Sequence, residues 1–304
     1  MQTREKQIIK TSWIGIIGNS LLSVLKITVG LISGSMAVVG DGIDSASDIV
    51  TSWITLFTAR IISRPPDNKY PYGYAKADTI ATIVLGLIIF FAGIQLAIST
   101  ISQIVQGDIH EMPSMLAVYV TGISILGKYF LSIIHFRIGK RIKSPMLVAN
   151  GKNMQNDIVI SVGVLVGLFF TFILKMPVLD KITALLISVW IMRVGYKIFI
   201  KTNVELMDGV KDPSIYKKVF KAVSRVDHAH NPHRVRIRNV GNLYIIAIDI
   251  EVDGSKSVSD SHEIAKKVEK SIKEEVVDVY DVIVHVEPYG NVEKETYGVS
   301  DNDI

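Results

Sequence analysis

The fold is decided by residues 36–59, which read MAVVGDGIDSASDIVTSWITLFTA. This length exceeds the roughly 20 residues that a helix needs to cross the hydrocarbon core of a bilayer. Three acids, Asp41, Asp44 and Asp48, follow one another at intervals of three and four residues, so they lie along one helix face. Carboxylates are costly inside a membrane and are therefore functional candidates. Because three clustered carboxylates repel one another, the segment predicts a cation between them.

Apolar segments of similar length occur on both sides of this one. The sequence predicts six spans in all, near residues 11–32, 36–59, 79–104, 113–136, 146–174 and 178–200. Hydrophobic residues make up 49% and charged residues 20% of the chain, and its mean hydropathy is +0.36. These values indicate a membrane protein rather than a soluble one. The chain has no cysteine, which excludes disulfides, thiolate zinc sites and thiol chemistry.

Basic residues cluster at alternate ends of the predicted spans. They occur in the N-terminal tail, in segments 60–76 and 137–152 and from residue 193 on, whereas segments 33–35 and 106–113 contain none. Since Lys and Arg accumulate on the cytoplasmic side of a membrane, we expect both termini in the cytoplasm. This distribution also accounts for the net charge of +4 without a nucleic-acid partner. No cleavage site follows the N-terminal tail, so we expect the first span to be retained.

The last third of the chain has the pattern of a small soluble domain. Residues 206–290 predict helices and strands in the order αββαβ, a metallochaperone-like α+β arrangement. We therefore divide the chain into a membrane all-α six-helix bundle, residues 1–205, a cytoplasmic domain, residues 206–290, and a tail, residues 291–304. The tail is polar and lacks periodicity, and we expect it to be disordered.

The fifth predicted span carries two further oxygen donors. Asn153 and Asp157 are four residues apart in NMQNDIVIS and so lie on one helix face. If that face meets the acidic face of the second span, the side chains of Asp44, Asp48, Asn153 and Asp157 form a small cation site. Other interpretations of two of these residues stay open. Asp41 can pair with a lysine or lie among lipid headgroups, and Asn153 can serve only as a hydrogen-bond partner between helices.

Four segments of the chain form a recognisable set. They are GSMAVVGDGIDSASDIVTS from residue 34, PYGYAKAD from residue 71, NMQNDIVIS from residue 153 and VHVEP from residue 284. Together with the six spans, they resemble the cation diffusion facilitator family of metal transporters, in its manganese-type bacterial form. The resemblance implies a homodimer in lipid of the bacterial plasma membrane, which alternates between inward and outward states and exchanges a divalent cation for protons. It places that ion on Asp44, Asp48, Asn153 and Asp157, with Asp41 accessory, and implies neither an enzyme nor a prosthetic group.

One ligand departs from the family's pattern. Zinc transporters of the family carry histidine where this chain has Asn153, so an amide oxygen replaces a nitrogen donor. Oxygen ligands suit Mn²⁺ while imidazole favours zinc, and we therefore predict Mn²⁺ as the transported ion. Zn²⁺, Fe²⁺ and Co²⁺ stay open as alternatives. Without this histidine, proton exchange rests on the aspartates. Tyr70 and Tyr74 also occupy positions that are often histidine, which argues against a metal site in their loop.

A second set of candidate ligands lies in the predicted cytoplasmic domain. The family binds metal at positions that align here with His233, Asp249, His262, His285 and Glu287. His285 and Glu287 are two residues apart on a predicted strand and so face the same side. The resemblance implies that a metal there stabilises the dimer or senses cytosolic metal. The alternative is an ordinary polar surface.

Other functional classes predict different critical residues. A membrane-anchored metal sensor would depend on His285 and tolerate loss of Asp157. An intramembrane enzyme would need a catalytic motif, and no HExxH, GxSxG or nucleotide-binding loop occurs. A channel is disfavoured because a closely ligated ion passes slowly. We also expect Lys76 and Asp208 to form a weak pair near the cytoplasmic mouth.

Overall fold

The computed structural model describes residues 2–62, 64–106, 112–142, 144–210, 212–240, 243–290 and 297–301. The chain divides into two compact units. The first comprises Met1–Phe57 and Ala81–Phe199, and the second comprises Thr58–Ile80 and Ile200–Ile304. The first unit is a helical bundle, and the second holds the C-terminal domain together with the adjoining helix ends and loop.

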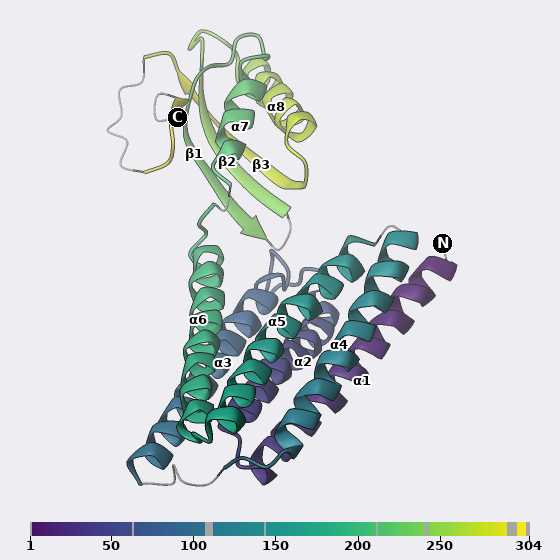
Figure 1. The fold of residues 1–304 in the computed structure, drawn as a ribbon. Coiled ribbons are helices and arrows are strands. Elements are labelled where there is room, and N and C mark those ends of the chain that lie inside the picture. The colour runs from purple at the N-terminus through teal and green to yellow at the C-terminus, as the bar shows by residue number, and fades with distance from the viewer. Residues whose placement is uncertain are drawn as a thin grey trace. The chain divides into compact units, whose positions relative to one another are not determined.

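Six long helices occupy the described part of the N-terminal two thirds of the chain (Figure 1). They are α1 (Gln2–Ile32), α2 (Met36–Ile62), α3 (Lys76–Val105), α4 (Leu116–Arg141), α5 (Pro145–Leu174) and α6 (Val178–Leu206). Each corresponds to one predicted span, so the all-helical bundle is confirmed. α1 begins well before its predicted span because the preceding residues, such as Glu5 and Lys6, are good helix formers.

Five stretches among the described residues are long and apolar enough to cross a membrane. They are Ile9–Ile32, Lys76–Val105, Leu116–Arg141, Leu147–Leu174 and Val178–Leu206. α2 is not among them, and it is the helix that carries Asp41, Asp44 and Asp48. Its polar residues face other helices, since Asp41 is fully buried and Ser45 is only 1% exposed. Such a helix is tolerated within a bundle because its polar groups find partners there.

The N-terminus of α2 is held by a buried acid of α6. Asp180 accepts hydrogen bonds from the backbone nitrogen of Met36, at 2.9 Å, and from the hydroxyl of Ser35. A carboxylate at this place satisfies free backbone donors and complements the helix dipole. The contact fixes where α2 starts and so fixes the level of its three aspartates.

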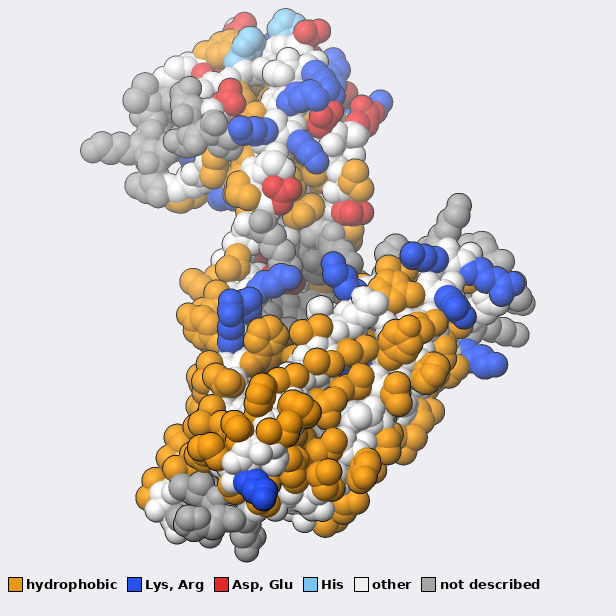
Figure 2. Space-filling model, in the orientation of Figure 1, with side chains coloured by type: hydrophobic (Ala, Val, Ile, Leu, Met, Phe, Trp, Pro, Cys, Tyr) orange, Lys and Arg blue, Asp and Glu red, His pale blue; other side chains and the backbone are white. Residues whose placement is uncertain are grey.

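Close helix contacts and an apolar core complete the bundle. A Cβ atom on Gly195 of α6 would lie 2.6 Å from the nitrogen of Phe90 and 2.7 Å from the oxygen of Gly86, so only glycine fits at this crossing with α3. The neighbouring core contains Leu85, Ile89, Leu96, Val164, Leu168, Ile187 and Ile191. Figure 2 shows hydrophobic side chains covering the visible face of the bundle, as contact with lipid tails requires.

The C-terminal domain contains two helices and three strands in its described residues. They are α7 (Ser214–Val223), β1 (His230–Val240), β2 (Leu243–Val252), α8 (Val258–Glu275) and β3 (Val279–Pro288). The sheet has the order β1-β2-β3, with β1 antiparallel and β3 parallel to β2. The parallel pair needs a crossover, which α8 supplies. The predicted αββαβ order is confirmed, while the predicted turn at 241–242 lies outside the described residues.

The helices of this domain cover one face of its sheet. Its buried core includes Val219, Ile246, Ile248, Ile250, Val268 and Ile272. Ser257 caps the N-terminus of α8, and its hydroxyl accepts a hydrogen bond of 3.1 Å from the backbone nitrogen of Asp260. The opposite face of the sheet carries apolar as well as charged side chains, since Ile245, Ala247 and Ile283 lie near Arg236 and Arg238.

The end of the chain differs from the predicted disorder where it is described. Positions 291–296 and 302–304 of the predicted tail lie outside the described residues. At 297–301 the chain lies along β1, and Val299 exchanges two backbone hydrogen bonds with Val235, of 2.9 and 3.0 Å. Tyr297 stacks on Arg234 and Arg236, with guanidinium carbons 5.2 and 5.3 Å from the ring centre. Composition alone did not indicate this edge pairing.

Candidate metal sites

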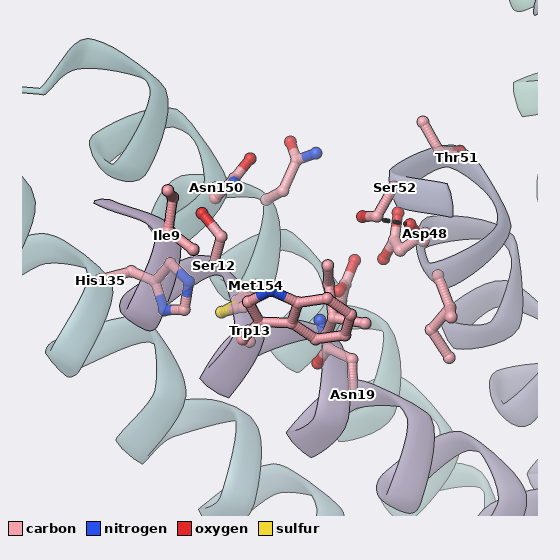
Figure 3. A pocket seen from close by; sticks show the side chains of 15 residues that line it. Ile9, Ser12, Trp13, Asn19, Asp48, Thr51, Ser52, His135, Asn150 and Met154 are labelled. Carbon is pink, nitrogen blue, oxygen red and sulfur yellow. Dashed lines mark hydrogen bonds between the residues drawn. The ribbon is translucent and has the colours of Figure 1, made fainter. Parts of the chain in front are cut away.

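A cavity of about 360 Å³ lies among α1, α2, α4 and α5 of the bundle. Three of the four predicted transport ligands line it, namely Asp48 from α2 and Asn153 and Asp157 from α5. Figure 3 shows Asp48 next to Ser52 on one side of the cavity. The fourth predicted ligand, Asp44, is not part of the lining and lies one helical turn before Asp48.

The faces of α2 and α5 that carry predicted ligands border the same cavity. Asp48 and Asp157 both line the cavity, and Asp44 and Asp48 are each close enough to Asp157 for an electrostatic interaction. Asn153 lies one turn before Asp157 and is exposed at the cavity. The cavity therefore gathers carboxylate and amide oxygens from two helices, which is the donor chemistry of a small divalent cation site.

A lysine that the sequence analysis did not consider lies beside these acids. Lys128 of α4 places its Nζ 2.8 Å from Asp157 Oδ2 and 2.8 Å from Ser45 Oγ. Its side chain is fully buried, whereas that of Asp157 is 11% exposed. One predicted ligand is thus already neutralised by a cation of the chain itself.

A second lysine pairs with Asp41. Lys26 of α1 lies 2.7 Å from Asp41 Oδ2, and both side chains are fully buried. Ser161 donates to both oxygens of Asp41, at 2.9 and 2.8 Å. Lys26 in turn donates to Ser161, at 3.0 Å, and to Ser45, at 3.3 Å. Of the two interpretations of Asp41, the lysine pair is therefore the one found, and the location among headgroups is wrong.

The network as a whole carries an excess of acid. Two lysines, Lys26 and Lys128, face four acids: Asp41, Asp44, Asp48 and Asp157. Buried charges are normally paired or bound to metal. With all groups ionised, the two acids in excess match the charge of one divalent cation.

The sequence contained a signal for both lysines. Lys26 and Lys128 are each a lone charge well inside a predicted span, so the cost that singled out the aspartates applies to them as well. Which acid each lysine meets depends on how the helices pack. Residue spacing along one helix carries no information on that pairing.

Other polar atoms of the cavity have free hydrogen-bonding capacity. In the part of the chain that the structure describes, Ser12 Oγ and Asn19 Oδ1 are buried and have no hydrogen-bond partner. Figure 3 shows both residues on α1, with Trp13 between them in sequence. Buried polar atoms without partners beside a cavity are the surroundings that ordered water or a hydrated ion takes.

An acid, rather than a metal ligand set, organises the loop between α2 and α3. Asp67 accepts hydrogen bonds from the backbone nitrogens of Lys69 and Tyr70, at 2.8 and 2.7 Å, and from the hydroxyl of Tyr74, at 2.5 Å. The bond from Tyr74 is the main reason why the pKa of Asp67 lies below its ordinary value. Both tyrosines thus serve the loop's own structure.

A second candidate site lies on the sheet of the C-terminal domain. The strand register sets Asp249 of β2 opposite His233 of β1 and His285 of β3. Ligand atoms of His233, Asp249 and Glu287 lie within 4.8 Å of one another, and His285 Nε2 is 3.4 Å from a Glu287 oxygen. His262 is exposed on α8 and is not one of this group. A histidine nitrogen and two carboxylates suit a divalent cation.

An arginine lies on the same acids. Arg234 Nε is 3.1 Å from Asp249 Oδ2, and its Nη1 is 3.8 Å from Glu287 Oε1. The guanidinium also donates to the hydroxyl of Tyr297, at 3.1 Å. In this arrangement the chain itself neutralises the acids that a metal would otherwise bind.

The predicted pair of Lys76 and Asp208 is present within the second unit. Lys76 Nζ lies 2.9 Å from Asp208, which also binds Arg238. Burial on its own would raise the pKa of Asp208, but hydrogen bonds from Arg238 and Lys76 outweigh it and hold that pKa below its ordinary value. Lys76 is 43% exposed, so the pair adds little stability.

Comparison with known proteins covers both parts of the chain. A family profile described as "Cation efflux transmembrane domain" matches residues 12–207, and one described as "Cation efflux protein, cytoplasmic domain" matches residues 212–289. The chain is 33% identical to the uncharacterized transporter YdbO of Bacillus subtilis over 92% of this chain and 95% of that protein. It is 30% identical to the magnetosome protein MamB of Magnetospira sp. over 85% and 88%, and 27% identical to the manganese efflux system protein MneP of Bacillus subtilis over 94% and 98%.

Proposed function

This chain belongs to the cation efflux family of cation diffusion facilitators, and we propose on this basis that it exports a divalent metal ion. We further propose that this ion is Mn²⁺. The family is one of metal transporters, and the chain is accordingly a multi-pass membrane transporter rather than an enzyme. The identity of the metal, its exchange for protons and the oligomeric state are what the proposal adds.

The donor set of the cavity carries the choice of metal. Asp48, Asn153 and Asp157, the predicted ligands in the lining, offer oxygen atoms alone. The imidazole of His135 also lines the cavity, with its Nδ1 2.9 Å from the backbone oxygen of Leu131, and it is not one of the predicted ligands. MneP, which is similar over nearly its whole length, is a manganese efflux system protein. The oxygen donors favour Mn²⁺ over Zn²⁺, and the likeness to MneP supports Mn²⁺, while Fe²⁺ and Co²⁺ stay open as alternatives within the same family.

The charge of the network supports exchange for protons. An excess of two acids binds one divalent ion, and when the ion leaves, protons can take its place on the carboxylates. Asp44 and Asp48 on α2 and Asp157 on α5 are the residues we assign to this exchange, with Asn153 as the fourth ligand and Asp41 accessory. The ion enters from the cytoplasm, the helices tilt, and the ion is released outside.

The setting of the protein follows from its family and its charge distribution. We place it in the bacterial plasma membrane as a homodimer, with both termini and the C-terminal domain in the cytoplasm. The group of His233, Asp249 and Glu287, with His285 beside it, then faces the cytosol. Metal bound there would report the cytosolic metal level or stabilise the dimer.

The test is a transport assay on the purified full-length chain in proteoliposomes. Mn²⁺, Zn²⁺, Fe²⁺ and Co²⁺ are offered in parallel while metal uptake and internal pH are recorded with separate dyes. We expect Mn²⁺ to move fastest and to drive proton movement in the opposite direction. Faster movement of zinc than of manganese would overturn the assignment of the metal, and metal movement without proton movement would overturn the exchange.

The group on the C-terminal sheet favours one function of another class, a membrane-anchored metal sensor. The two functions separate in a manganese-sensitive cell that lacks its own exporter. Asp157→Ala should abolish protection of that cell if the chain is a transporter, while His285→Ala should leave most of it. The reverse result would support the sensor.

A further inference from the structure

Lys128 forms an ion pair with Asp157, one of the proposed ligands of the transported ion. Its Nζ lies 2.8 Å from Asp157 Oδ2, and its side chain is fully buried. We propose that Lys128 is a tethered competitor of the metal: its ammonium group neutralises Asp157 when no metal is bound, and it must move aside before the ion can bind. The inference rests on the proposed function, because it takes Asp157 as a ligand of the ion.

The two buried lysines differ in what surrounds their acids. Asp41, the partner of Lys26, accepts from Ser161 with both oxygens and is fully buried, so its pair is closed. Asp157, the partner of Lys128, lines the cavity and is partly exposed to it. Only the second acid can be reached by an ion from the cavity, and only its lysine competes with that ion.

Lys128 has a second hydrogen-bond partner besides Asp157. Its Nζ lies 2.8 Å from Ser45 Oγ, so the lysine can keep this bond while it moves away from Asp157, although the same hydroxyl also accepts from Lys26, at 3.3 Å. The four-carbon stem of Lys128 is flexible and its three donors rotate freely. This movement takes the ammonium group of Lys128 away from the metal ion, because the two cations would otherwise repel strongly in the low dielectric of the bundle.

The competition sets how tightly the metal is held. An acid cluster without the lysine would bind a divalent ion more strongly, since no charge has to be displaced first. An exporter needs binding that is weak enough to release the ion. Lys128 thus favours release by returning to Asp157 as the ion leaves, and it is a positioning residue for transport rather than a ligand.

The test compares metal binding by purified full-length variants with calorimetry, using MnCl₂ as the probe. Lys128→Met should bind Mn²⁺ at least about tenfold more tightly, because the competing charge is gone. In proteoliposomes the same variant should show a lower KM together with a lower kcat, since release becomes slow. Unchanged or weaker binding of Mn²⁺ by a folded Lys128→Met overturns the inference.

Lys128→Arg tests the proposed competition between this residue and the metal if Lys128→Met does not fold. A guanidinium holds a carboxylate with two hydrogen bonds and is harder to displace, so this variant should bind Mn²⁺ about tenfold more weakly. Unchanged or tighter binding by Lys128→Arg overturns the inference.

Lys181→Met is the matched control. Lys181 is also a buried lysine of the bundle, but it donates to Gln103, at 2.6 Å, rather than to a predicted ligand. Its loss should leave Mn²⁺ affinity unchanged. If Lys181→Met tightens Mn²⁺ binding as much as Lys128→Met does, the cause is a general charge effect and not the proposed competition.

The failure of this inference and the failure of the proposed function give different results. A wild-type chain that neither binds nor moves any of the four metals overturns the proposed function as well. Normal transport with unaltered Mn²⁺ affinity in both Lys128 variants overturns this inference alone.

Discussion

Lys26 and Asp41 form an ion pair of 2.7 Å between α1 and α2, and both side chains are fully buried. Ser161 of α5 donates to both oxygens of Asp41, so three helices meet at one acid. Removing two charges from water is costly, and the pair is retained only while each charge keeps its partner. The contact therefore fixes how these helices pack beside the cavity.

Lys26→Met should destabilise the bundle strongly, by about 3–5 kcal/mol, because Asp41 is left as an uncompensated buried charge. The double variant Lys26→Met, Asp41→Asn should recover much of that loss. Thermal unfolding in detergent, followed by tryptophan fluorescence, measures both. Equal loss in the single and the double variant would show that the ion pair is not the cause.

Asn153→His should shift transport toward zinc. It replaces the amide oxygen at the cavity with an imidazole nitrogen, which zinc prefers. We expect the ratio of zinc to manganese transport to rise about tenfold, which corresponds to about 1.4 kcal/mol. Asn150→His is the matched control, since Asn150 lines the same cavity one turn earlier but is not a predicted ligand. An equal shift in both variants would argue against Asn153 as a ligand.

The helices and strands were predictable because each is encoded locally. Long, largely apolar runs predicted the six bundle helices, although α2 with its three acids is not among the stretches apolar enough to cross a membrane. Helical spacing and strand alternation predicted the αββαβ order. The spacing of four residues between the predicted ligands on each of α2 and α5 was also predictable, whereas the meeting of the two helix faces was assumed rather than predicted. These features depend on periodicity along a single element.

The partners of those donors were not predictable from spacing. Lys128 and Asp157 are far apart in sequence, and their contact exists only once α4 lies against α5. Arg234 meets Asp249 because a register shift in β1 sets the pairing of the strands. Val299 joins β1 through backbone atoms, which side-chain composition cannot reveal.

Asp208 should make the second unit sensitive to acid. The pKa of Asp208 is lower in the folded chain than in the unfolded chain, where it is about 3.9. The ionised Asp208 therefore contributes its full stabilisation above a pH of about 3.9 and loses it as the pH falls through the pKa of the folded chain. Asp208→Asn should cost about 1 kcal/mol or less at pH 7 and should lessen the loss of stability on acidification. Unfolding midpoints at several pH values check this. Lys76→Met should reproduce part of the effect, and an unchanged acid response in Asp208→Asn would contradict the assignment.

His233→Ala should remove one bound metal ion per chain from the C-terminal domain and leave transport through the bundle largely intact. His233 is a nitrogen donor of the group on the sheet, and an ion that binds there takes the place of Arg234 on Asp249 and Glu287. Equilibrium dialysis of the full chain against MnCl₂ counts the bound ions. His262→Ala is the control, because His262 is exposed on α8 outside that group. The same count in wild type and His233→Ala would mean that no ion is held there.

The pairing of Val299 with Val235 bears on how this protein is handled at high concentration. β1 is an edge strand, and an uncovered edge is a template on which strands of other molecules can add. Residues 297–301 cover part of that edge as a cap, through the pairing of Val299 with Val235. Shortening the chain before Tyr297 removes the cap and exposes the strand to aggregation between molecules. A purification tag is therefore better placed at the N-terminus than next to this cap.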